Sequence, residues 1–243
     1  MLSMKRIWIA TATLAATLLA LLPASALART VELGVPKSAL VTPSCPSSVK
    51  PTQCTIILTE VTALETISDG VAYPTTVKAD GQLVAFTLGL SNLSSNRTTA
   101  KNEIKGLDAT YGGVPQAQIA VLRKTGKKSQ RKYKVIAESP IVHLIPYLGQ
   151  VAQFPLTTSL PVKRGDVIGL SVPTWAPVLS INLPSKSFAY RQGRTGHCSS
   201  ASTSPAAQRV KQTTAYNCNY PGTRVEYSAT EVTSPTPTPN YVH

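Results

Sequence analysis

A run of basic side chains near the middle of the sequence is its most concentrated chemical feature. Seven lysines and arginines fall within twelve residues: Arg123, Lys124, Lys127, Lys128, Arg131, Lys132 and Lys134. Side chains of one sign that are held together repel one another and attract a polyanion. The run therefore predicts an anion-binding surface, with a solvated loop that only aids solubility as the alternative. Tyr133 is the only aromatic residue of the run, which argues against stacking on nucleic-acid bases and hence against a nucleic-acid partner.

A second candidate site combines aromatic and cationic residues closer to the C-terminus. Trp175 stands between Pro173 and Pro177, and an exposed indole ring is suited to stacking on a sugar. The predicted carbohydrate-stacking platform consists of Trp175, Tyr190, Arg191 and Arg194. The alternative is that Trp175 is a packing residue of the core.

Residues suited to catalysis are sparse. The histidines are His143, His197 and His243, and no Gly-x-Ser-x-Gly motif is present, so no serine–histidine–aspartate triad is predicted. The eleven acidic residues are scattered, and we expect nearly all of them at turns or on solvated faces. A glycoside hydrolase needs two carboxylates roughly 5 to 9 Å apart. A non-catalytic protein without a cofactor is favoured, and a carbohydrate-active sandwich enzyme is the alternative.

The cysteines predict a disulfide-bonded protein. Cys45, Cys54, Cys198 and Cys218 form an even set, which in an exported chain indicates two disulfides. We prefer the pairs Cys45–Cys54 and Cys198–Cys218 among the three possibilities, because each closes a short loop bounded by turn-forming residues. A zinc site that includes His197 is the alternative, but no Cys-x₂-Cys pair is present, so no metal is predicted.

Residues 1–28 have the pattern of a secretory signal peptide. Lys5 and Arg6 precede an uncharged, mostly apolar run over 7–22, and Ala26 and Ala28 supply small residues at positions −3 and −1 of a cleavage site. An uncleaved membrane anchor is the alternative, but the run is shorter than the roughly 20 residues of a spanning helix. We therefore expect a secreted, extracellular or cell-wall-associated protein that has no transmembrane span after cleavage.

The rest of the sequence is typical of short strands separated by turns. Turn dipeptides such as Asp69-Gly70 and Asp80-Gly81 divide apolar, β-branched segments at spacings of about 8 to 12 residues, which indicates an all-β antiparallel sandwich or barrel. The expected strands are 55–62, 82–90, 116–123, 133–139, 141–144, 151–154, 167–172, 178–182, 188–191 and 224–233. No convincing helical periodicity is visible, and proline is frequent. The basic run lies on the loop of the expected 116–123 and 133–139 hairpin.

The domain prediction is a single β-sandwich over residues 55–233. A chain of 243 residues with 42% hydrophobic residues can bury one large core. Residues 29–54 are rich in proline and are expected to form an extended, irregular arm that the first disulfide holds to the body. Residues 234–243 are expected to be a disordered Pro/Thr tail.

One segment carries a resemblance to a known architecture. Phe154-Pro155-Leu156-Thr157 is followed by Leu160-Pro161-Val162-Lys163-Arg164-Gly165-Asp166-Val167-Ile168-Gly169-Leu170. Gly165 permits a tight bend, and Asp166 can bond to the backbone of the turn. The pattern resembles a turn found in jelly-roll modules of secreted bacterial proteins, and the whole chain is similar to secreted bacterial β-sandwich proteins. The resemblance implies a jelly-roll-like sandwich and no particular activity.

These observations together predict a secreted, basic, non-catalytic β-sandwich protein. Its net charge is +13, from 24 basic and 11 acidic residues. The expected partner is an anionic cell-wall polymer or a carbohydrate.

Overall fold

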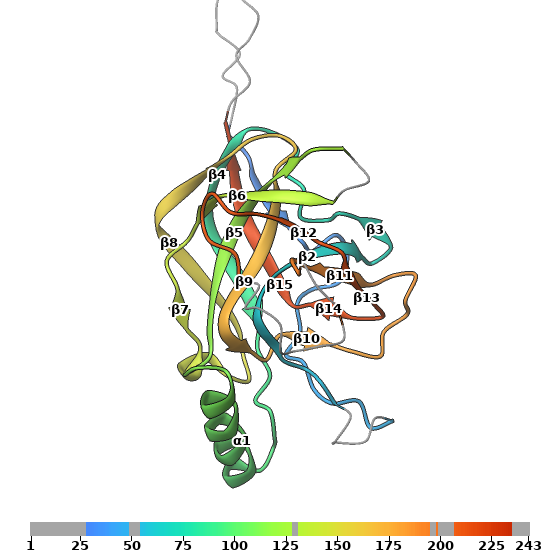
Figure 1. The fold of residues 1–243 in the computed structure, drawn as a ribbon, viewed down its shortest axis with the longest axis vertical. Coiled ribbons are helices and arrows are strands. Elements are labelled where there is room, and N and C mark those ends of the chain that lie inside the picture. Colours follow the sequence, from blue (N-terminus) through green and yellow to red (C-terminus); the bar gives the residue numbers. More distant parts are fainter. Residues whose placement is uncertain (1–27, 49–53, 128–130, 195–197, 199–206, 235–243) are drawn as a thin grey trace, which may run out of the picture. The chain divides into compact units, whose positions relative to one another are not determined.

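The computed structural model describes five parts of the chain. These are residues 28–48, 54–127, 131–194, 198 and 207–234. The predicted signal peptide before Ala28, the predicted tail after Ser234, Lys128 and His197 lie outside the described residues. Strands in antiparallel sheets are the main regular structure of Arg29–Ser234, so the predicted all-β class is confirmed (Figure 1).

The smaller sheet contains four antiparallel strands in the order β1-β15-β4-β8. Their bounds are β1 Thr30–Leu33, β15 Tyr227–Thr233, β4 Gly81–Gly89 and β8 Val151–Val162. Strand β1 belongs to the arm that was predicted to be irregular, and this prediction is wrong for its first residues. Thr30 to Leu33 pair with Val232 to Ala229 of β15, and Leu33 is buried in the core.

The larger sheet follows the order β12-β6-β5-β9-β2-β11-β13. Its strands are β12 Thr213–Ala215, β6 Lys132–Glu138, β5 Gln116–Thr125, β9 Val167–Ala176, β2 Leu58–Ser68, β11 Ala189–Gln192 and β13 Cys218–Pro221. Two short strands pair onto this sheet, β3 Val71–Ala72 onto β2 and β7 Val142–His143 onto β5. Strands β10 Leu179–Ser180 and β14 Arg224–Val225 form a separate ladder.

The larger sheet curls into a half-barrel because its two edges are joined by a very short link. Strands β12 and β13 lie at opposite ends of the strand order, yet only Tyr216 and Asn217 separate them in the sequence. An extended chain advances at most about 3.6 Å per residue, so the two edges approach within about 11 Å of each other. The Arg191 guanidinium on β11 donates hydrogen bonds to the carbonyl oxygens of Tyr216 (3.3 Å) and Asn217 (3.0 Å) and holds this link.

Curling gives the larger sheet two buried faces. On β5, Ile119 and Val121 join the main core between the sheets, whereas Ala120 and Leu122 join a second cluster on the other face. Side chains alternate between the faces of a strand, so a strand buried on both sides is apolar at consecutive positions. Tyr216 fills the second cluster, which also contains Tyr133 at a ring distance of 5.3 Å.

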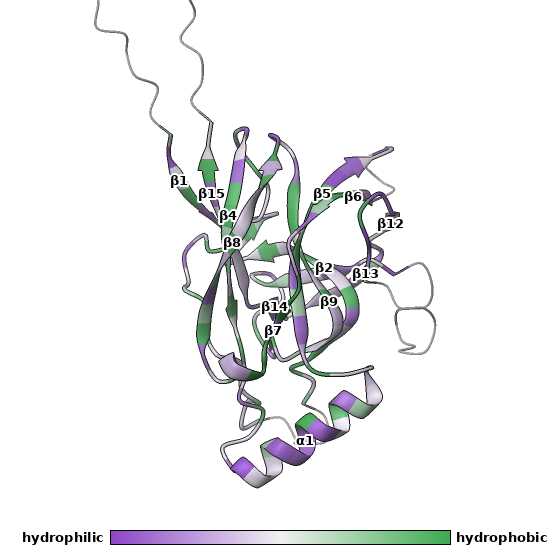
Figure 2. Ribbon diagram, turned by 90° about the vertical axis from the view of Figure 1, so that its left-hand side faces the viewer, coloured by the Kyte–Doolittle hydropathy of each residue, from purple (hydrophilic) through white to green (hydrophobic). Residues whose placement is uncertain are grey.

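A helix that the sequence analysis did not predict precedes β5. Helix α1 spans Arg97–Thr110 and begins at Asn96, whose side chain accepts a hydrogen bond from the Thr99 amide at 3.0 Å. None of its residues is buried, and Figure 2 shows mostly hydrophilic residues along it. Its partly buried apolar residues are Ala100, Ile104 and Leu107, followed by Tyr111 just after the helix. This spacing is helical, but so few apolar residues give only a weak sequence signal. In the described part of the chain, no helix has the length and apolar character needed to cross a membrane.

Candidate anion-binding surface

The described cations of the predicted run belong to the outer part of the β5–β6 hairpin, and Figure 2 shows hydrophilic residues there. Arg123 is paired with Lys134 and Thr125 with Lys132, so these four side chains project from one face of the hairpin. Gly126, at the turn, has a φ of +71°, the conformation for which glycine was expected there. The hairpin with a basic tip is therefore confirmed by the structure.

Arg123 differs from the other cations because it is neutralised. Its Nε and Nη2 atoms donate to the two carboxylate oxygens of Asp166, each at 2.8 Å, and this bidentate bond raises the pKa of Arg123. Asp166 is buried and also accepts a hydrogen bond from the Lys163 amide at 2.9 Å. Arg123 therefore fixes the turn between β8 and β9 to β5, and it is a structural residue rather than a free anion-binding group.

The remaining cations of the run are exposed. They are Lys124, Lys127, Arg131, Lys132 and Lys134, with Lys128 outside the described residues. None of these five forms an ion pair with a described acidic residue. The structure thus presents at least five uncompensated positive charges on one hairpin.

Two cations distant in sequence extend this group. The Lys211 amide donates to the Val135 carbonyl at 2.9 Å, and the Val135 amide donates to the Gln212 carbonyl at 2.9 Å, which places the segment before β12 beside β6. Arg209 and Lys211 are exposed on this segment. Lys124 is paired with Tyr133 and therefore points to the opposite face of the hairpin from Lys132 and Lys134. We call the set Lys127, Arg131, Lys132, Lys134, Arg209 and Lys211 the basic surface. No local pattern predicts the addition of Arg209 and Lys211, because it depends on pairing between distant strands.

One acid borders the basic surface. Glu138 on β6 accepts hydrogen bonds from the Gln118 side chain (2.9 Å) and from the Val210 amide (3.1 Å). Burial raises the pKa of Glu138, while these hydrogen bonds and the charge of Arg209 oppose that rise. Glu138 therefore anchors the segment before β12 and offsets part of the charge of Arg209.

The predicted carbohydrate-stacking platform is wrong for Trp175 and Tyr190, because both rings are buried. Trp175 is 0% exposed, and its Nε1 donates to Asp108 Oδ1 (3.0 Å) and to the Gly113 carbonyl (3.1 Å). It therefore ties the end of α1 to β9, in agreement with the alternative that it packs in the core. Tyr190 is also buried and stacks on Tyr220 at 4.8 Å.

The two arginines of that platform have other surroundings. Arg191 lies near Arg131, Tyr73 and Tyr133. Burial is the main cause that lowers the pKa of Arg191, and the like charge of Arg131 lowers it further. Arg194 donates from Nε to the Gln192 side chain at 2.8 Å. The four predicted platform residues therefore do not form one exposed surface.

Burial also affects Tyr133, the aromatic residue within the basic run. Burial, with the neighbouring Tyr73 hydroxyl, raises its pKa to about 12. Its ring packs against Tyr216 inside the curled sheet. Tyr133 is therefore a packing residue beneath the basic surface.

Both predicted disulfides are present. Cys45 is bonded to Cys54 and Cys198 to Cys218. The described residues contain no group of three or more histidine, cysteine or acidic side chains that could hold a metal ion.

The structure brings together Glu65, Glu226 and Arg224, whereas the acidic residues were expected to be scattered. Glu65 on β2 is 0% exposed, and neither of its carboxylate oxygens has a hydrogen-bond partner. Glu226 is 1% exposed and lies 3.6 Å from Arg224, measured from Oε2 to Nε. The expectation that nearly all acids lie at turns or on solvated faces is therefore wrong for this group.

This buried charge cluster holds the N-terminal arm. Arg224 donates to the carbonyl oxygens of Ser38 (3.0 Å) and Ala39 (3.2 Å), and Glu226 accepts from the Val41 amide at 3.2 Å. Burial raises the pKa of Glu226, and it raises that of Glu65 well above the ordinary value, although the charge of Arg224 opposes both shifts. Because both carboxylates are enclosed and Glu226 is bonded to the arm, they do not present an open pair to a sugar.

Comparison with known proteins adds no relative: no family model, no curated protein and no solved structure matches the chain. The fold and the site define an all-β, disulfide-bonded protein with a cationic hairpin.

Proposed function

We propose that this is a secreted, non-catalytic protein that uses the basic surface to bind an anionic polymer of the cell wall or the extracellular space. The observation that carries the proposal is the group of exposed, unpaired cations on β6 and around it. The β5–β6 hairpin and one distant segment, the residues before β12, contribute to this group, so the fold adds Arg209 and Lys211 to charge that is already concentrated in the sequence.

The physics of exposed ion pairs favours a polymer over a small anion. One exposed pair contributes only about 0.2 to 1 kcal/mol, so a single small anion would bind weakly. Alternate residues on a strand lie about 7 Å apart, and Lys132 and Lys134 are such a pair. This distance is shorter than the roughly 8 Å over which physiological salt screens charges, so one polyanion can interact with several cations together.

Export and a jelly-roll-like architecture belong to the same proposal. The predicted signal peptide and the two disulfides support an oxidising, extracellular location. The tight turn at Gly165, with a φ of +93°, supports a relationship to jelly-roll modules of secreted bacterial proteins.

The test removes four charges from the basic surface. The variant carries Lys127→Gln, Lys132→Gln, Lys134→Gln and Arg131→Asn, because asparagine tolerates the φ of +45° at position 131. We expect its affinity for a purified glycerol-phosphate polymer at low salt to fall tenfold or more, and wild-type binding to weaken as salt rises.

A charge-matched control separates this site from net charge. It carries glutamine at Lys37, Lys78, Lys105 and Lys186, which are exposed lysines outside the basic surface. The control should retain most of the wild-type affinity. Equal binding by wild type and the hairpin variant, or equal losses in both variants, would contradict a role for the basic surface.

A further inference from the structure

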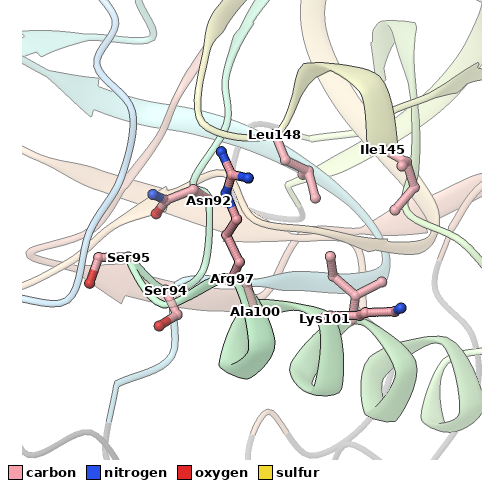
Figure 3. A pocket seen from close by; sticks show the side chains of 9 residues that line it. Asn92, Ser94, Ser95, Arg97, Ala100, Lys101, Ile145 and Leu148 are labelled. Atoms are coloured by element: carbon pink, nitrogen blue, oxygen red, sulfur yellow. The ribbon is translucent and has the colours of Figure 1, made fainter.

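A groove lies between helix α1 and the short 3₁₀ helix η3, Ile145–Tyr147 (Figure 3). Its volume is about 450 Å³, within the size range of small-molecule sites. Arg97 and Lys101 of α1 line it, and Figure 3 shows Arg97 extending from the helix toward Asn92 and Leu148. The groove therefore combines two cations with an apolar wall.

The apolar wall is formed by both helices. Ile104 lines the groove from α1, and Ile145 and Leu148 line it from η3 and the residue after it. Ile145 remains 41% exposed. A large aliphatic side chain exposed at the edge of a concave site gains free energy when an apolar ligand covers it.

The η3 side of the groove is held in place by backbone hydrogen bonds. The Leu90 amide donates to the Gln150 carbonyl at 2.9 Å, and the Gly149 amide donates to the Leu90 carbonyl at 3.0 Å. Tyr147 packs its ring on Phe154 at 5.0 Å. The segment that carries Ile145 and Leu148 is thus fixed to the smaller sheet without a ligand.

The cations of α1 are unfavourable for the helix itself. Arg97, Lys101 and Lys105 recur at every fourth residue, and like charges at this spacing repel each other. Arg97 is the first helical residue, where the helix dipole disfavours a cation. No acidic residue lines the groove, and neither Arg97 nor Lys101 forms an ion pair with a described acid. A bound anion would remove this repulsion.

We propose that this groove binds a soluble single-chain amphiphile with an anionic head group, such as a long-chain carboxylate. The head group lies between Arg97 and Lys101, and the chain lies against Ile104, Ile145 and Leu148. The dimensions of the groove fit one molecule rather than a bilayer surface.

This site is separate from the basic surface. Strand β5 runs from the region after α1 to the hairpin tip over ten residues, a length of roughly 30 Å. The two proposals can therefore fail independently.

The experiment measures binding of dodecanoate to the full chain by titration calorimetry below the micelle concentration. Wild type should bind, and octanoate should bind more weakly by about fourfold for each methylene removed. The double variant Arg97→Gln, Lys101→Gln should lose tenfold or more in affinity, and Ile145→Ser should also weaken binding.

Lys105→Gln is the matched control, because Lys105 lies on the same helix and does not line the groove. It should bind dodecanoate as wild type does, and helical circular dichroism should be unchanged in all variants. The proposal is overturned by an absence of dodecanoate binding, by equal binding of an uncharged dodecyl glycoside, by equal losses in the control, or by binding only to anionic lipid vesicles.

Discussion

Glu65 provides the sharpest test of the physical reasoning, through the substitution Glu65→Gln. Its carboxylate is fully buried, and both oxygens lack hydrogen-bond partners. Burial raises its pKa well above the ordinary value of 4.5, the charge of Arg224 opposes this shift, and the charges of Glu226 and Asp69 add to it. With one arginine and two glutamates in the cluster, a proton on Glu65 leaves the cluster neutral.

The sign of the pH dependence follows from the raised pKa of Glu65. Above pH 4.5 the unfolded chain releases this proton, whereas the folded chain keeps it until the higher folded pKa is reached. The folded state binds more protons across this interval, so the free energy of unfolding falls as pH rises through it. The stability contributed by protonated Glu65 is thus fully present at acid pH and is lost toward neutral and alkaline pH.

Glutamine keeps the shape of the side chain and cannot ionise, so Glu65→Gln should flatten this dependence. A buried, poorly paired carboxylate costs several kcal/mol, and an unsatisfied amide costs about 1 to 3 kcal/mol. We expect the variant to be about 1 to 3 kcal/mol more stable than wild type at alkaline pH and close to wild type near pH 4. For a domain of this size the gain corresponds to a Tm higher by roughly 2 to 10 °C.

The assay is urea unfolding with intact disulfides, repeated from acid to alkaline pH. Glu103→Gln is the control, because Glu103 is an exposed glutamate on α1. If the free energy of unfolding changes with pH in the same way in wild type and in Glu65→Gln, the assignment of the proton to Glu65 is refuted. The same conclusion would follow if Glu103→Gln flattened the curve equally.

Three further predictions concern single contacts. Asn96→Ala should destabilise α1 by about 1 kcal/mol and Asn96→Gly by only a few tenths of a kcal/mol, because glycine is tolerated at this cap position. Circular dichroism on heating should show Asn96→Ala melting at a lower temperature than Asn96→Gly, and the reverse order would contradict the cap. Asp166→Asn leaves Arg123 without its charged partner, and we expect the free energy of unfolding to fall by about 1 to 3 kcal/mol. The loss should be smaller in the double variant Asp166→Asn, Arg123→Met, and simple additivity of the two single losses would argue against a stabilising pair. Replacing Cys198 and Cys218 together by serine should lower the free energy of unfolding by about 2 to 5 kcal/mol, and an unchanged denaturant midpoint would contradict a stabilising role.

Local sequence patterns were sufficient to predict most of the longer strands and the pairing of the cysteines, whereas β1, β3, β12 and β13 were missed. The β5–β6 hairpin is an example, because apolar and β-branched residues flank a polar loop that contains Gly126. Residue type alone also located most of the basic surface. Each of these features depends on residues within about twenty positions of each other.

The features that were missed depend on contacts between distant parts of the chain. Glu65 and Arg224 meet only because β2 and β14 pack together, and Trp175 is buried because α1 and the residues after it cover its indole nitrogen. Helix α1 has no buried residue, so its apolar pattern was too weak to recognise. An exposed aromatic platform and a buried tryptophan look the same in sequence.

The pairing of β1 with β15 has a consequence for how the domain can be rearranged. The Thr233 amide donates to the Arg29 carbonyl at 2.8 Å, and the Arg29 amide donates to the Thr233 hydroxyl at 3.1 Å. The start of β1 and the end of β15 therefore lie side by side at one end of the smaller sheet. A short linker could join them, and new termini could be opened at an exposed turn to give a circular permutant. The same adjacency would allow the whole domain to be inserted into a loop of another protein.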